Sequence, residues 1–99
     1  MAAYVYVLEI GIDLRDAQDL KEKRKLVSSL KAQVRRRFVA SIAEIAAHDD
    51  RRRAVLLCSL VGGAEVRERA AELERFVETR CPERCTFSRD LLTLDDIRG

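Results

Sequence analysis

Two sets of side chains alternate along the N-terminal segment with a period of two. One set is Tyr6, Leu8, Ile10 and Ile12, and the other is Val5, Val7, Glu9 and Gly11. Alternation of this kind, in a run rich in β-branched and aromatic residues, is typical of a β-strand. The pattern therefore predicts a strand over Tyr4–Asp13.

The pattern changes to a helical period after a short polar stretch, because apolar residues then recur every three or four positions. Asp19 is a suitable N-cap, and Glu22 three residues later completes a capping-box-like pair. A helix is therefore expected over Leu20–Arg37. The remaining elements expected from the same reasoning are a strand over Val39–Ala47, a strand over Arg53–Val61, a helix over Ala64–Thr79 and a strand over Cys85–Leu94.

The order β-α-β-β-α-β is typical of the ferredoxin-like class of α+β folds. That architecture has a four-stranded antiparallel sheet with both helices on one face. A chain of 99 residues has room for one core and not two. The sequence thus predicts a single ferredoxin-like domain over residues 1–99.

Positive charge is concentrated in the first helix. The segment 20–37 holds eight basic residues against Glu22 alone, so it carries +7, while the whole chain carries only +2. At about 100° per residue, most of these cations fall opposite the apolar arc, namely Lys21, Arg24, Lys25, Lys31, Arg35 and Arg36. Such a ridge can contact the phosphate groups of a nucleic acid without reading its sequence.

Lys23 departs from this pattern, because its angle lies inside the apolar arc of the helix. Its stem can lie along the sheet while the ammonium reaches water. A buried ammonium needs a carboxylate, which Glu9 or Glu44 can supply. A third alternative directs Lys23 toward a ligand at the edge of the sheet, and so it joins the candidate nucleic-acid-binding residues.

The strand at 53–61 is apolar on both of its faces, which raises the question of what covers the second face of the sheet. One side carries Ala54, Leu56, Cys58 and Leu60, and the other carries Val55, Leu57, Ser59 and Val61. An open face of an antiparallel sheet is ordinarily polar. The expectation is a homodimer formed through this face. A monomer with scattered exposed valines is the alternative.

Several classes of function find no support in the residues. His48 is the single histidine, and Gly62-Gly63 lacks the phosphate-loop lysine, so no enzyme, metal or cofactor is expected. Cys81 and Cys85 are spaced as C-x3-C, either as plain loop cysteines or as a redox-sensitive pair whose thiol pKa Arg80 and Arg84 lower. No apolar run has the length of a membrane span and no signal peptide is evident, which favours the cytoplasm.

Four pieces of the sequence resemble a known family. The segment 19–27 reads D-L-K-E-K-R-K-L-V and is similar to the motif S-L-K-E-K-R followed by apolar residues; Arg37-Phe38, the segment 41–45 and the segment 53–55 follow at matching intervals. The chain thereby resembles, from Tyr4 to about Leu94, the YlxP-like family of small bacterial proteins, catalogued as a domain of unknown function. Asp19 replaces the motif's serine, and the aromatic residue expected after the turn at 47–51 is missing.

The resemblance implies a ferredoxin-like fold and no established activity. Genes of the family tend to lie beside those for transcription elongation, translation initiation and ribosome maturation. The positions that match the family are Leu20, Lys21, Glu22, Lys23, Arg24, Glu44 and Arg53. We therefore expect a non-enzymatic protein that binds structured RNA or a ribosomal particle through helix 20–37. The alternative is a dimeric interaction module that uses the same helix to dock an acidic protein.

Overall fold

A computed structural model describes residues 2–81 and 85–99 of the chain. The elements are β1 (Tyr4–Asp13), α1 (Leu20–Phe38), β2 (Ser41–Ala46), β3 (Arg53–Gly62), α2 (Val66–Arg80), β4 (Cys85–Thr93) and α3 (Leu94–Arg98). The four strands form one antiparallel sheet in the order β2-β3-β1-β4. The predicted ferredoxin-like α+β fold is confirmed.

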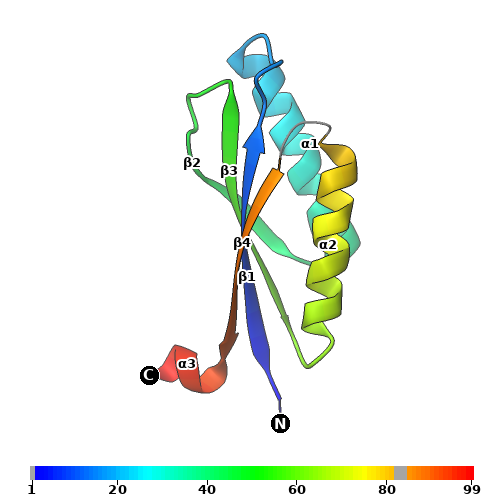
Figure 1. Ribbon diagram of the computed structural model, residues 1–99, viewed down its shortest axis with the longest axis vertical. Coiled ribbons are helices and arrows are strands. Elements are labelled where there is room, and N and C mark those ends of the chain that lie inside the picture. The colour runs from blue at the N-terminus through cyan, green and yellow to red at the C-terminus, as the bar shows by residue number, and fades with distance from the viewer. Residues whose placement is uncertain (1, 82–84) are drawn as a thin grey trace.

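The molecule has two layers, with α1 and α2 on one face of the sheet and the other face without a helix over most of its length (Figure 1). The alternation predicted for β1 holds, since Leu8, Ile10 and Ile12 are buried under the helices. They meet the buried set of β3 from Ala54 to Leu60 and the apolar sides of both helices. The core therefore lies between the sheet and the helices.

Two elements begin later than the sequence predicts, and one helix was not predicted. Val39 is the C-cap of α1 at φ 52°, its N–H bonded to Arg35 O, so β2 begins only at Ser41. Helix α2 begins at Val66, two residues later than predicted. The chain also ends in a short helix that was not predicted, because Thr93 and Asp96 form a capping box at the end of β4.

Lys23 does not reach water. Its side chain is fully buried, and its ammonium group lies 3.1 Å from Glu44 Oε2. The same nitrogen donates to the carbonyl oxygens of Ala47 at 2.5 Å, Asp50 at 2.8 Å and His48 at 3.3 Å. The expectation of a stem with an exposed ammonium is wrong, and of the two carboxylates considered, Glu44 is the partner.

Candidate nucleic-acid interface

Helix α1 begins where its side chains satisfy the free N–H groups of the first turn. Asp19 accepts a hydrogen bond from Glu22 N at 2.8 Å, and the Glu22 carboxylate accepts one from Gln18 N at 3.1 Å. These reciprocal bonds resemble a capping box and place an acidic group at the positive end of the helix dipole. Two residues of the L-K-E-K-R segment, Glu22 and Lys23, are thus used in building the fold.

The burial of Lys23 corrects its assignment to the nucleic-acid-binding set. An ammonium group has three N–H donors, and here three carbonyl oxygens of the turn after β2 surround it. Glu44 Oε2 is buried and accepts no hydrogen bond, so its contact with Lys23 is one of charge alone. No phosphate can approach a cation enclosed in this way, and Lys23 instead fixes the turn at 47–50 against α1.

Two other candidates are exposed but already hold partners. Arg24 Nη2 lies 3.8 Å from Asp49 Oδ1, and both side chains are largely in solvent. Arg35 Nη2 donates to the carbonyl oxygen of Ile42 at 2.8 Å. An exposed ion pair of this length contributes little free energy, so Arg24 remains accessible to an anion. Arg35 keeps four N–H donors beyond the one bonded to β2.

Four cations of the predicted set remain without a partner. Within residues 2–81 and 85–99, no hydrogen bond or ion pair is made by the side chains of Lys21, Lys25, Lys31 and Arg36. We call these four residues the free cations of α1. Lys31 is half-buried and the other three are exposed.

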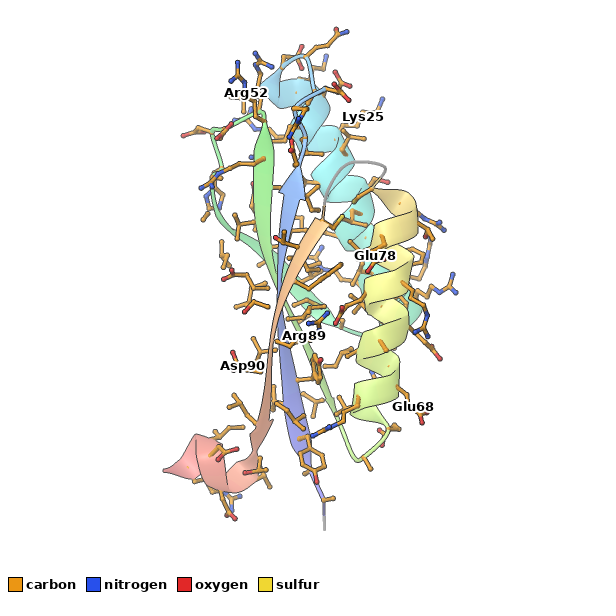
Figure 2. All side chains as sticks on the ribbon, in the orientation of Figure 1. Lys25, Arg52, Glu68, Glu78, Arg89 and Asp90 are labelled. Carbon is orange, nitrogen blue, oxygen red and sulfur yellow. The ribbon has the colours of Figure 1, made fainter. Side chains whose placement is uncertain are left out.

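Most of the free cations share one stripe of the helix. At about 100° per residue, Lys21, Lys25 and Arg36 lie on the side directed away from the core, with Ser28 and Ala32 between them. Figure 2 shows Lys25 projecting outward from α1, away from the sheet. The stripe extends over about 22 Å of helix axis at 1.5 Å per residue. Its small central side chains allow a phosphate backbone to approach the helix closely.

The sequence pattern did not reveal that two guanidinium groups lie together on the α2 side of α1. The Cζ atoms of Arg37 and Arg80 lie 5.0 Å and 4.3 Å from the ring centroid of Phe76. Arg80 also donates to Gln33 Oε1 at 2.9 Å, which ties the two helices together. The spacing of Gln33 and Arg37 places both on one side of α1, but only the pairing of the helices brings Arg80 to them.

Cys81 is the C-cap of α2 and Cys85 begins β4, and their thiol groups lie in contact. Burial and, to a smaller extent, the neighbouring Cys85 thiol together raise the pKa of Cys81 to about 12. Burial also raises the pKa of Cys85. Both thiol pKa values are thus raised, whereas the alternative of a redox-sensitive pair required them to be lowered. Arg84, one of the two arginines invoked, lies outside the described residues.

Neither a metal site nor a membrane-spanning helix is found among the described residues. Residues 2–81 and 85–99 contain no group of three or more His, Cys, Asp or Glu side chains that could hold a metal ion. His48 is exposed, with Nε2 3.1 Å from the carbonyl oxygen of Glu44. None of the described helices is both long and apolar enough to cross a membrane.

A cavity of about 310 Å³ lies beside the free cations, between α1, the end of β1 and the end of α2. Its walls are mainly apolar, with Ile12, Leu26 and Leu30 among the lining residues. Leu26 has an angle on the helix close to that of Leu30, yet it is 48% exposed at the edge of this cavity. The apolar arc of α1 is therefore narrower than the sequence pattern indicates.

The fold and the site together define a small ferredoxin-like α+β domain with a cationic helix on its outer layer. Within that class, the chain belongs to the family described as "protein of unknown function (DUF503)", whose model matches residues 5–89. The family assignment expected from the L-K-E-K-R segment and its surroundings is confirmed.

No curated protein matches the sequence. Among solved structures, the chain is similar to a de novo designed protein with a ferredoxin fold, studied by solution NMR. The TM-score is 0.40 at 16% identity, over 92% of this chain and 85% of the designed one.

Proposed function

We propose that this protein is a cytoplasmic RNA-binding protein that contacts the phosphate backbone of structured RNA, such as that of a ribosomal particle, through α1. The observation that carries the proposal is the set of free cations, Lys21, Lys25, Lys31 and Arg36, which the described fold leaves unpaired. Unpaired cations on one helix surface release counterions when they meet phosphates, which drives association.

The free cations favour recognition of shape and charge over recognition of base sequence. Sequence-specific binding to single strands on a sheet of this kind uses aromatic side chains on its open face. Tyr4, Tyr6 and Phe87 pack instead against the core, on the helix side of the sheet. The face of the sheet that α1 and α2 do not cover carries no aromatic side chain among the described residues. Backbone contacts from α1 are therefore the mode that the residues support.

The position of the free cations on the helix also supports the proposal. Lys21 and Lys25 lie near the N-terminus of α1, where positive charge opposes the helix dipole by a few tenths of a kcal/mol for each exposed residue. They gain no compensating ion pair within the described structure. No contact in the described structure offsets the unfavourable interaction of these lysines with the helix dipole. Their placement is suited to binding an external anion.

The experiment measures binding to purified ribosomal subunits and to a structured RNA at low and at higher salt. A Lys25→Glu, Arg36→Glu variant should lose at least about tenfold in affinity at low salt, because two phosphate contacts become repulsive. The matched control is Arg67→Glu, Arg75→Glu, which reverses two exposed cations on α2. Absence of binding by the unaltered protein at low salt, or equal losses in both variants, would contradict the proposal.

A second candidate function is docking of an acidic protein partner, and the apolar cavity beside α1 favours it. An acidic peptide with one apolar side chain could place that side chain against Leu26 while its carboxylates meet the free cations. Nuclease treatment separates the two functions. Binding to ribosomal particles that survives complete digestion of the RNA would favour the protein partner, whereas binding to protein-free RNA favours the first proposal.

A further inference from the structure

The face of the sheet turned away from α1 and α2 carries many apolar side chains that the chain itself does not cover. Val61 is 70% exposed, Ile45 is 44% exposed and Leu57 is 38% exposed. The strand register places Val5 beside Val61 and next to Leu92, which extends the apolar surface across β3, β1 and β4. We call this surface the open face. Its apolar side chains are those of Val5, Val7, Ala43, Ile45, Val55, Leu57, Val61 and Leu92, and the register also places the exposed carboxylates of Glu9 and Asp90 on it.

The open face is more apolar than is usual for a sheet surface that meets only water, although Glu9 and Asp90 interrupt it. Single exposed apolar residues are ordinary on a protein surface, but a contiguous group of them marks an interaction site. Figure 1 shows that the short helix α3 lies on this same side of the sheet, near one end. It adds Leu94 and Ile97, at 42% and 53% exposure, so the apolar surface continues beyond the strands.

The total exposed area of the chain is large for its mass. A compact monomer of this mass exposes roughly 5,700 Å², whereas this chain exposes 6506 Å². The difference of about 800 Å² is of the same size as the area that each partner contributes to an interface of standard size. The shape agrees, because the radius of gyration is 14.2 Å where about 12.6 Å is typical of this length.

An added strand at the β2 edge would have to displace contacts that this edge already makes. Arg35 Nη2 donates to the Ile42 carbonyl oxygen, and His48 Nε2 lies 3.1 Å from the Glu44 carbonyl oxygen. Side chains therefore occupy two backbone acceptors of β2. Native proteins block edge strands in this general way, so pairing through the β2 edge is disfavoured relative to contact through the open face.

We propose that the open face is the interface of a homodimer, and that the occupant is a second copy of this chain. Two copies joined face to face bury Leu57 and Val61 of both, and each supplies the area that the other lacks. The basic helices then lie on the two outer layers, far from the interface, so their charges do not oppose pairing. This inference is independent of RNA binding.

The test is the mass of the full chain by sedimentation equilibrium at tens of micromolar. The unaltered protein should have twice the chain mass of 11.3 kDa. A Leu57→Lys, Val61→Lys variant should have the mass of one chain, because four lysines would lose their hydration in the interface and only the two at position 57 lie beside a carboxylate, that of Glu9. Both positions are exposed in the monomer, so the variant should keep its circular dichroism spectrum. Leu26→Lys, an exposed leucine on the helical layer, is the matched control and should stay dimeric.

A single-chain mass for the unaltered protein at this concentration would overturn the proposal. A dimer that persists in the Leu57→Lys, Val61→Lys variant would also overturn it, since association would then use the β4 edge or another surface. If the double variant loses its circular dichroism spectrum, Ile45→Lys replaces it. That variant should likewise weaken the dimer and should raise its dissociation constant at least about tenfold.

Discussion

Two kinds of lysine stand side by side in one short segment of α1. Lys21 and Lys25 are exposed and have no partner in the described structure, whereas Lys23 between them is fully buried with Glu44 and three backbone carbonyl oxygens. All three contribute equally to the sequence charge. Their physical environments make one a structural anchor and the other two available to a partner.

The difference shows that a basic segment and a binding surface are not the same thing. The family motif includes Lys23, and a reader of the sequence alone counts it with the other cations. In the fold Lys23 holds the turn at 47–50 against the start of α1. Part of the motif therefore has a structural role. Glu74, which is nearly buried and accepts from Arg89 Nε at 2.6 Å, joins α2 to β4 in a comparable way. Figure 2 shows Arg89 on the α2 side of β4 and Asp90 on the other.

The largest effect should come from removing the buried cation. Lys23→Met keeps the volume of the side chain but leaves Glu44 and three carbonyl oxygens without their positive partner. We expect the free energy of unfolding to fall by about 3–5 kcal/mol, the usual cost of breaking one half of a buried ion pair. Denaturant unfolding followed by circular dichroism measures it.

The control is the same substitution at the exposed lysine. Lys21→Met should change the free energy of unfolding by no more than about 0.5 kcal/mol. Equal losses of unfolding free energy at the two positions would contradict the distinction between the buried Lys23 and the exposed Lys21. A Lys23→Met, Glu44→Met double variant should recover part of the loss, because it removes the orphaned carboxylate as well.

The next effect concerns an ionisable group of the core. Burial raises the pKa of Cys58 from its ordinary value near 9.0 to about 11. Its thiol is therefore protonated in the folded chain at pH values where the unfolded chain has lost the proton. The contribution is fully present below pH 9 and is lost as the pH rises toward 11, at about 1.4 kcal/mol of unfolding free energy for each pH unit.

Unfolding curves between pH 8 and pH 11 check this prediction. A Cys58→Ala variant should start from lower stability at neutral pH, because it leaves a small cavity, but should lose less with rising pH. Parallel curves for the two proteins would mean that Cys58 does not couple to folding. Cys81, with its pKa also raised, contributes equally to both proteins and drops out of the difference.

The smallest expected effect is that of the free cations on stability. Lys21→Gln removes a positive charge from the N-terminal turn of α1, so it should leave the free energy of unfolding unchanged or raise it by a few tenths of a kcal/mol. Arg36→Gln removes a favourable charge from the last turn and should lower it by a similar amount. Thermal unfolding at low salt measures both. A loss above about 1 kcal/mol in either would indicate a structural role instead.

Much of the fold follows from local patterns. The alternation in β1, the Asp19 cap and the apolar run of β3 are each short-range signals, and together they determine the order of elements. The start of β2 was missed because Val39 adopts a left-handed conformation, which β-branched residues rarely do. The helix α3 was missed because its capping box follows directly on a strand.

The candidate site was only partly predictable, for a different reason. The exposure of Lys25 and Arg36 follows from their angle on the helix, but the partners of Lys23 and Arg35 depend on where β2 and its turn pack. Arg80 reaches Phe76 beside Arg37 only through the pairing of α1 with α2. The high thiol pKa of Cys81 depends on burial, which its loop position in the sequence conceals.

The salt dependence of RNA binding tests the central claim most directly, because it counts the phosphates that the free cations meet. For about four contacts with duplex RNA, log K should fall against log salt with a slope of roughly −3 to −4. A Lys25→Gln, Arg36→Gln variant should give a slope shallower by about 2, while Arg67→Gln, Arg75→Gln should leave it unchanged. A steep slope that the first variant reduces and the second does not would support the account. No binding at low salt, or one slope common to all three proteins, would contradict it.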